Sequence, residues 1–513
     1  MKKVIRIIAA PIIGFFLLTT LSCADSAPGP NQGEIPVDLN LVKTHQVKLQ
    51  EIASQNGNNR AAGTAGYDQS VQYVAAQLTA AGYSPVLQEF TITRFKETSD
   101  PVLEQVTPNS VVYPRNVPEG FITLSYSGSG NVTALVQPVD LMIPMDPNNP
   151  PSTSTSGCEP EDYAGFVPGN IALLQRGSCT FEVKVANAQT AGAAGVIIMN
   201  EGQPDRTEAF AGTLGHPDFL IPAVFANYSI GVELSDLIQG GFPVRAHLKV
   251  DALLESRITC NIIADTPGGD ATRTVVVGAH LDSVSAGPGI NDNASGSAAI
   301  LEVAYKMGLL RIEPKHKIRF AFWSAEEEGL LGSEYYVAHL APEERAKISL
   351  YLNVDMIASP NYVRFVYDGD GSDSPNAGPP GSEQIEKLFT DYFAGTGLPT
   401  DPTAIDGSSD HGSFAARNIP VGGIYAGSSE IKTEEMAKKY GGTAGAPCDP
   451  NYHTPDDTVA NLNYTIEEQM LKAIAYAVLT YGNTLLNPPP RAGLAGKRMQ
   501  TYQPTYKGPR AIR

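Results

Sequence analysis

Short apolar runs that lead into acidic residues or histidine recur through the second half of the chain. Helical patterns separate these runs, which predicts parallel strands linked by crossover helices. In such sheets, sites form outside the carboxyl ends of the strands, so the polar residues that follow the runs should meet in one crevice. The runs and the polar residues after them are 274–279 with His280, 318–323 with the glutamates 326–328, and 348–354 with Asp355.

Two further polar residues lie in loops of the same half of the chain. Asp292 lies in the glycine-rich turn 287–293, and His453 lies in the polar stretch 449–457. Two histidines and three carboxylates can hold two zinc ions if one carboxylate bridges the ions and each ion keeps an open position. The pattern therefore predicts a metal site at the edge of an α/β sheet.

These motifs, in this order, resemble those of the co-catalytic two-zinc aminopeptidases of metallopeptidase family 28. The resemblance extends over roughly residues 37–485. It implies that Asp292 bridges the two zinc ions. His280 and Asp355 would complete one zinc site, and Glu327 and His453 would complete the other.

The resemblance also implies catalytic and supporting roles. Glu326 would be the general base that takes a proton from the attacking water, and Tyr452 would help to hold the developing oxyanion. Asp282 would fix the tautomer of the histidine two residues before it. Adjacent glutamates can serve different roles because neighbouring side chains at a strand end point in different directions. A cis peptide bond is expected between Asp292 and Asn293, as in the family.

The implied activity is release of the N-terminal residue from peptides that have a free amino terminus. The two zinc ions would polarise the scissile carbonyl and lower the pKa of a bridging water. Carboxypeptidase-type or dipeptidase relatives, single-zinc glutaminyl cyclases and receptor-like binding proteins are the alternatives. The complete ligand set argues against a receptor, and the insert argues against a cyclase. No arginine cluster suited to a substrate carboxylate can be recognised, which argues against a carboxypeptidase. Ser408 stands where many relatives have arginine, so the preferred residue stays open.

A segment before the metal half has a different character. Residues 128–250 are rich in glycine, proline and short β-type runs and contain none of the candidate ligands. An apolar run over 171–177, a helical stretch over 183–192 and a second run over 196–200 resemble the protease-associated domain. Such an insert could be a lid that shapes substrate access or a packing module, because a fold alone does not define a function.

Five cysteines are present, and four of them follow the N-terminal segment. The resemblance to the protease-associated domain implies a disulfide between Cys158 and Cys179. The sequence does not determine the state of Cys260 and Cys448. Their spacing fits neither a zinc ribbon nor a redox motif.

The fold expected from these patterns is α/β, with a mixed, mostly parallel sheet covered by helices on both faces and a small β-rich insert. Helices are predicted over 37–55, 67–81 and 466–485, and a strand over 86–92. The predicted division is a signal peptide (1–23), a linker (24–36), the first part of the peptidase domain (37–127), the protease-associated domain (128–250), the peptidase domain with the zinc site (251–486) and a disordered tail (487–513).

Composition and charge narrow the class of partner. With 513 residues, 42% hydrophobic and 18% charged, the chain can bury large cores and form two or three domains. Its 54 acidic residues outnumber the 36 lysines and arginines, which gives a net charge of -18. This balance argues against nucleic acid as a partner, and we interpret the acidity as favouring solubility. The oligomeric state is not predicted.

The N-terminal segment has the pattern of an export signal. Lys2, Lys3 and Arg6 precede an apolar stretch over 7–18, which is too short for a standard membrane span. Residues 20–23 resemble a bacterial lipoprotein cleavage box, in which Cys23 would carry the lipid. Cleavage after residue 24 would instead give a freely secreted protein. We favour the lipoprotein, whose only link to the membrane would be the lipid anchor at Cys23.

Overall fold

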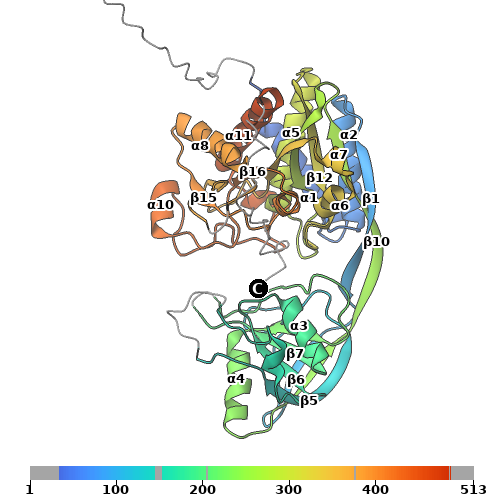
Figure 1. Cartoon of the computed structure of the whole chain (residues 1–513), viewed down its shortest axis with the longest axis vertical. Helices are drawn as coiled ribbons and strands as arrows, with labels where there is room; N and C mark the ends of the chain where they lie inside the picture. Colours follow the sequence, from blue (N-terminus) through green and yellow to red (C-terminus); the bar gives the residue numbers. More distant parts are fainter. Residues whose placement is uncertain (1–33, 145–152, 204–205, 375–376, 485, 487–513) are drawn as a thin grey trace, which may run out of the picture. The chain divides into compact units, whose positions relative to one another are not determined.

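The computed structural model describes residues 34–144, 153–203, 206–374, 377–484 and 486. These residues form two eight-stranded sheets with helices packed against them (Figure 1). The predicted signal peptide, the proposed lipid site at Cys23, most of the linker and the C-terminal tail lie outside the described residues. The α/β class is therefore confirmed for the described part of the chain.

The first sheet is mixed. β11 pairs in parallel with both β12 and β13, and β13 pairs in parallel with β16. β10 pairs antiparallel with β12 on one side and, over residues 252–263, with all of β1 on the other. In spatial order the strands are β1 (Val86–Glu97), β10 (Ala252–Asp265), β12 (His316–Trp323), β11 (Asp270–His280), β13 (Ile348–Val354), β16 (Val421–Tyr425), β14 (Phe365–Tyr367) and β15 (Asp401–Thr403).

Both faces of this sheet are buried, which explains its continuous apolar runs. Val275 and Val277 belong to a core cluster that includes residues of α1, α2, α5, α8 and α11, whereas Val276 belongs to a second cluster with α6 and α9. Side chains alternate between the faces because the period of a strand is two residues. Trp323 is fully buried in the second cluster, as expected for a core residue. The helices are α1 (Leu39–Gln55), α2 (Ala65–Ala80), α5 (Gly296–Leu309), α6 (Leu331–His339), α7 (Pro342–Arg345), α8 (Ser382–Gly395), α9 (His411–Ala415), α10 (Glu434–Tyr440) and α11 (Tyr464–Asn483), with short helical turns η2 (Ile290–Ser295) and η3 (Val459–Asn461).

The two N-terminal helices begin at capping residues. The Asp38 carboxylate accepts the amide hydrogen of Asn40, and the Thr64 hydroxyl accepts an amide hydrogen from the first turn of α2. A Cβ atom on Gly66 would lie 2.1 Å from the carbonyl oxygen of Asn59. Only glycine therefore lets α2 start directly against this loop, whose neighbouring residue Arg60 reaches the candidate site described below.

The second sheet belongs to the insert. Helix α3 packs on one face of it and helix α4 on the other. The sheet also contains β2, β3 and β4, which lie within residues 37–127, the part assigned from the sequence to the first segment of the peptidase domain. These strands join the insert because β2 pairs with β9 and β4 pairs with β8. The elements are β3 (Val111–Val112), β2 (Val102–Thr107), β9 (Arg245–Val250), β5 (Gly130–Pro138), β6 (Ile171–Gln175), β7 (Gly195–Met199), β8 (Ala223–Ala226), β4 (Phe121–Thr123), α3 (Phe181–Thr190), α4 (Tyr228–Gln239) and the short turn η1 (Pro160–Tyr163).

Of the four cysteines among the described residues, two form a disulfide and two are free thiols. Cys158 and Cys179 form the expected disulfide within the insert. Cys260 and Cys448 are free thiols, and burial raises the pKa of Cys448 to about 12. A buried thiol with a raised pKa has little thiolate character at neutral pH, so Cys448 is a packing residue rather than a nucleophile.

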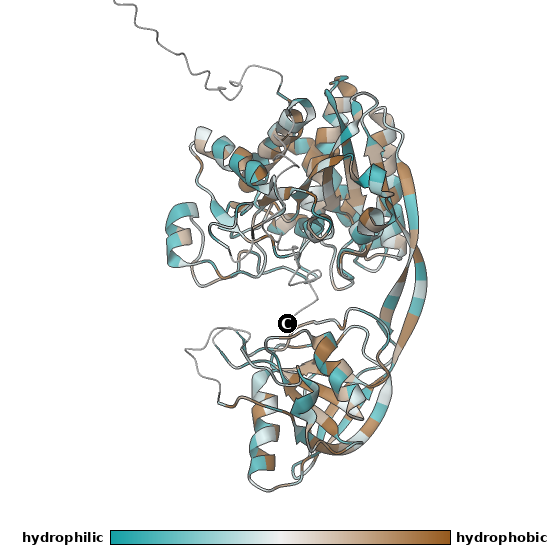
Figure 2. Cartoon of the chain, in the orientation of Figure 1, coloured by the Kyte–Doolittle hydropathy of each residue, from teal (hydrophilic) through white to brown (hydrophobic). Residues whose placement is uncertain are grey.

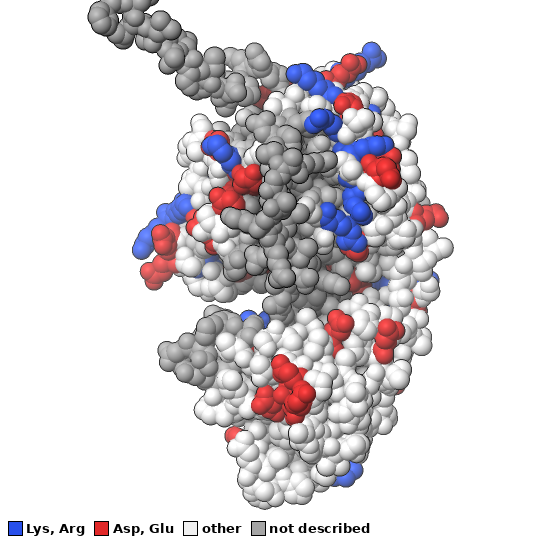
Figure 3. Space-filling model, in the orientation of Figure 1, with Lys and Arg blue, Asp and Glu red and all other residues white. Residues whose placement is uncertain are grey.

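Apolar residues are concentrated in the strands and in the helix faces that cover them, whereas α10 is hydrophilic and has no buried residue (Figure 2). On the face shown in Figure 3, acidic and basic side chains alternate around the first sheet, and the visible charges of the insert are mostly acidic. Among the described residues, no helix combines the length and the apolar character that a membrane crossing requires.

Candidate metal centre

The candidate ligands converge at the carboxyl ends of the central strands. His280 is the last residue of β11, and Asp355 directly follows β13. Glu326 and Glu327 follow β12 by a short turn. Because β12, β11 and β13 are parallel neighbours, their carboxyl ends lie at one edge of the sheet. The parallel pairing of these strands thus places the side chains next to each other.

Asp292 lies between the two histidines. One of its carboxylate oxygens is 3.1 Å from Nε2 of His280, and the other is 3.1 Å from Nε2 of His453. Nε2 of His280 is also 3.4 Å from the carboxylate of Asp355, and Nε2 of His453 is 3.1 Å from that of Glu327. The carboxylate of Asp292 therefore faces two separate groups of donors, one at each histidine.

The donor atoms fit metal cations. Glu326 Oε2, Glu327 Oε1 and Asp355 Oδ1 are buried and accept no hydrogen bond from the described residues. Leaving such oxygens buried without a partner is costly, and a bound cation would remove that cost. His280, Asp292 and Glu327 form one group that could hold an ion, and His280, Glu326 and Asp355 form another. The two groups share His280, and the residues present therefore suit a metal cation.

Electrostatics supports the same conclusion. Burial raises the pKa of Glu326 well above its ordinary value; His280 opposes this shift, and neighbouring carboxylates add to it. Burial would also raise the pKa of Asp292, but hydrogen bonds with His280 and His453 lower it below the ordinary value. Several buried carboxylates lie close together in this site, and their negative charges repel each other. Bound divalent cations would supply the positive charge that offsets this repulsion.

Asp282 contacts His280 and the backbone of both glutamates. Nδ1 of His280 lies 3.2 Å from the backbone carbonyl oxygen of Asp282 and 3.7 Å from its carboxylate. The same carboxylate accepts the amide hydrogens of Glu326, at 3.3 Å, and Glu327, at 3.4 Å. The backbone of Asp282 thus orients the imidazole, and its side chain holds the turn that carries both glutamates.

The loop 407–411 contributes a support that the sequence reasoning did not assign. The hydroxyl of Ser409 donates to the carboxylate of Asp355 at 2.6 Å. The next residue, Asp410, is buried near His280, and burial raises its pKa to about 7. The departure at Ser408 leaves these contacts in place, because they come from the two residues that follow it, Ser409 and Asp410.

Two other sequence expectations can be compared directly with the structure. The peptide bond between Asp292 and Asn293 is cis, which confirms that prediction. The ring of Tyr452 stacks on the ring of His453, with 3.8 Å between the ring centroids. Tyr452 is therefore at the site, beside one of the candidate ligands.

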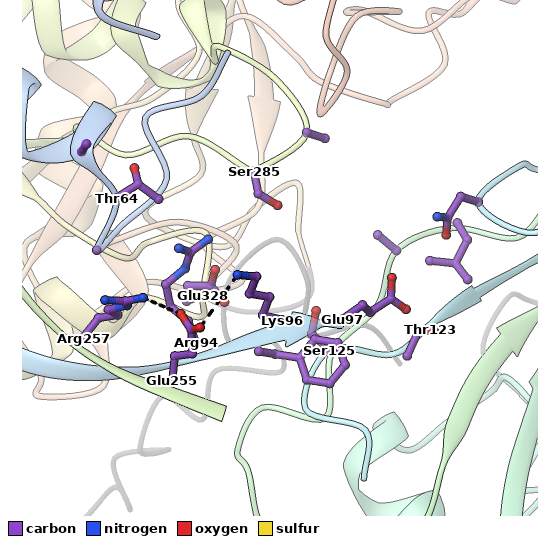
Figure 4. A pocket seen from close by; sticks show the side chains of 17 residues that line it. Thr64, Arg94, Lys96, Glu97, Thr123, Ser125, Glu255, Arg257, Ser285 and Glu328 are labelled. Carbon is purple, nitrogen blue, oxygen red and sulfur yellow. Dashed lines mark hydrogen bonds and ion pairs between the residues drawn. The ribbon is translucent and has the colours of Figure 1, made fainter. Parts of the chain in front are cut away.

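A cavity of about 730 Å³ lies beside the site, and none of the candidate ligands lines it. Figure 4 shows Arg94, Lys96 and Arg257 around Glu255, which pairs with Arg257 at 2.7 Å and with Lys96 at 3.9 Å. Glu328 also lines this cavity, whereas the two glutamates before it face the histidines. The cavity is thus separate from the metal centre, and the acidic run divides between the two.

Two known families together match most of the residues that the structure describes. The family described as Peptidase family M28 matches residues 261–478, and the PA domain matches residues 139–234. The first match contains all the candidate ligands. The second lies within the insert that carries the disulfide.

Individual relatives are similar over longer stretches. An aminopeptidase of Pseudomonas aeruginosa is 47% identical over 439 residues, which cover 85% of this chain and 79% of that protein. A probable leucine aminopeptidase 2 of Aspergillus fumigatus is 39% identical over 433 residues, which cover 84% of this chain and 81% of that protein.

Among solved structures, an aminopeptidase from Aneurinibacillus sp. strain AM-1 is similar with a TM-score of 0.70 and 26% identity, covering 88% of this chain and 96% of that chain. BSAP, a zinc aminopeptidase from Bacillus subtilis, is similar in fold, with a TM-score of 0.61 and 24% identity. The similarity covers 87% of this chain and 95% of that chain.

Proposed function

The chain belongs to peptidase family M28 and is an aminopeptidase, and from this premise we propose that its metal centre holds two zinc ions. The observation that carries the proposal is the carboxylate of Asp292, whose two oxygens each lie 3.1 Å from a different histidine. Imidazole and carboxylate donors suit zinc, and the related Bacillus subtilis enzyme is described as a zinc aminopeptidase. The proposed ligands are His280, Asp292, Glu327, Asp355 and His453.

When bound, the ions would supply Lewis acidity to the scissile carbonyl and to the attacking water. Glu326 would take the proton of that water and pass it to the leaving amine. Its buried Oε2, which accepts no hydrogen bond from the described residues, and its raised pKa suit a group that must both accept and hold a proton. Tyr452, stacked on His453, would donate its hydroxyl hydrogen to the oxyanion that develops on the substrate.

The substrate would be a peptide with a free amino terminus. A direct test compares aminoacyl anilides with their N-acetylated forms and with a peptide blocked at its carboxyl terminus. Release from the free anilide and from the blocked peptide, without release from the acetylated forms, is the expected result. Cleavage that requires a free carboxyl terminus would instead indicate a carboxypeptidase.

We propose further that the protein is exported. The export proposal rests on the basic and apolar N-terminal segment, which is followed by a sequence that resembles a lipoprotein cleavage box and ends at Cys23. The disulfide within the insert agrees with this, since disulfides persist mainly in oxidising compartments.

A further inference from the structure

The loop that precedes Asp292 is held from two sides by buried charged groups. We infer that Arg60 and Asp457 are positioning residues, which together form a clamp that sets the place of the Asp292 carboxylate between His280 and His453. The clamp is defined as the contacts of Arg60 and Asp457 with residues 281–292. This inference rests on the proposed function, because it assigns a support to the ligand that would bridge the ions.

Arg60 holds the outgoing side of the loop. Its Nε donates to the carbonyl oxygen of Pro288 at 2.9 Å and its Nη2 to that of Gly289 at 2.6 Å. Its Nη1 donates to the carbonyl oxygen of Leu281. The backbone amide of Arg60 donates to the hydroxyl of Ser283 at 2.9 Å. A planar guanidinium thus joins the residue after His280 to the residues just before Asp292, which a single-point donor such as lysine could not do.

Asp457 holds the other side. One oxygen of its carboxylate accepts the amide hydrogen of Asn291 at 2.6 Å, and the other accepts that of Asp292 at 3.0 Å. Its backbone carbonyl oxygen accepts the amide hydrogen of Ile290 at 3.2 Å. Three consecutive amides that end at the bridging residue therefore donate to one residue, which lies four positions after His453.

The loop is also closed sterically around Arg60. Gly289 has a φ of +61°, and a Cβ atom there would lie 2.2 Å from the carbonyl oxygen of Asp292 and 3.2 Å from Nη2 of Arg60. The backbone at Gly289 therefore approaches both the clamp and the ligand closely. A loop packed in this way transmits a displacement at Arg60 directly to Asp292.

Charge adds a second reason for an arginine at this place. Arg60 is fully buried, and burial lowers its pKa to about 10, although the nearby carboxylates of Asp282, Asp457, Asp292 and Glu327 oppose this shift. Several buried carboxylates thus lie near one guanidinium, and among the described residues its hydrogen bonds go to carbonyl oxygens of the loop and not to the carboxylates. Its positive charge offsets the acids and leaves the carboxylate oxygens of Asp292 and Glu327 available for metal ions.

The test compares Arg60→Lys, Arg60→Met and Asp457→Asn with Arg364→Met as the matched control. Arg364 is also buried, but it donates to Pro399 and Gln469 and packs against aromatic rings. Four quantities are measured on full-length protein: zinc retained during dialysis against a chelator, the visible spectrum of the cobalt-substituted form, kcat with KM, and the melting temperature of the metal-free form.

We expect each clamp variant to lose metal at least roughly tenfold faster than the wild type, with an altered cobalt spectrum and a fall in kcat larger than the change in KM. Arg60→Lys keeps the positive charge but lacks the planar guanidinium that bonds several carbonyl oxygens at once. It should therefore also lose metal faster and show the altered spectrum. Arg364→Met should lower the melting temperature and leave metal retention and the spectrum unchanged.

Wild-type metal retention and spectrum in both Arg60→Lys and Asp457→Asn would overturn the clamp, and these two variants decide the matter if Arg60→Met fails to fold. A wild type that binds a single ion would sink the two-zinc proposal instead. Retention of that ion in the variants would still test the clamp, because Asp292 lies beside both histidines.

Discussion

Glu326 and Glu327 are neighbours in the chain, yet their surroundings predict opposite consequences of mutation. Glu326→Gln keeps the shape of the side chain and removes the base, so kcat should fall by roughly two to four orders of magnitude. Zinc content should stay at the wild-type level. Glu327→Gln should lose zinc, and its activity should fall with metal occupancy, because its carboxylate faces His453. Both results follow from kcat and from metal analysis of the same preparations.

Glu328→Gln is the matched control for this pair. Its side chain lines the neighbouring cavity, so the substitution should leave zinc content and kcat close to wild type. Loss of zinc in Glu328→Gln, combined with zinc-replete but inactive Glu327→Gln, would show that the base and the ligand are each one residue further along the chain.

Helices α1 and α11 meet at a buried carboxyl group, which should make their packing sensitive to pH. Glu467 on α11 accepts a hydrogen bond from Gln46 on α1, and burial raises its pKa from 4.5 to about 8. The folded state therefore binds this proton more tightly than the unfolded state. The stability that Glu467 contributes is present at low pH and is lost as pH rises from about 4.5 to about 8.

Glu467→Gln cannot ionise, so its melting temperature should exceed that of the wild type at pH 8.5 by roughly 1–3 °C and match it near pH 4.5. Thermal unfolding of the metal-free protein across this range measures the difference. Glu468→Gln is the control, because Glu468 is half-exposed and pairs with Lys472. An equal effect of pH on both variants would contradict the role given to Glu467.

The whole molecule should bind two zinc ions per chain, and chelation should abolish an activity that added zinc restores. The reason is the double approach of Asp292 to two histidines, with Glu327 and Asp355 completing the two groups. Metal analysis of the purified protein gives the stoichiometry. Full activity with a single ion would contradict the bridged centre.

Export can be tested separately from catalysis. Cys23→Ser should move the protein from a membrane fraction to a soluble fraction, because the proposed lipid could no longer be attached. Fractionation of cells that produce each form measures this. A wild-type protein that is already soluble and begins at Asp25 would show that the segment is an ordinary signal peptide.

The sequence by itself determined which residues are proposed as the main ligands of the metal centre. Buried parallel strands require continuous apolar runs, so the runs before His280 and Asp355 mark strand ends without reference to the rest of the fold. The order of the remaining ligands then resembled one family closely enough to place Asp292, Glu327 and His453. These patterns are local in the chain. They identify strands because neighbouring strands and covering helices bury each strand on both faces, which requires apolar residues at every position.

Only the tertiary structure showed which other charged residues matter. Asp456 and Asp457 are adjacent and chemically alike, but the first is exposed and the second is buried against Asp292. Arg60 lies in a polar loop with nothing in its neighbours to mark it, and its three acceptors lie more than 200 positions along the chain. Likewise, β2 belongs to the insert because it pairs with the distant β9. Burial and long-range pairing depend on how separate segments pack together, and a local pattern carries no record of that packing.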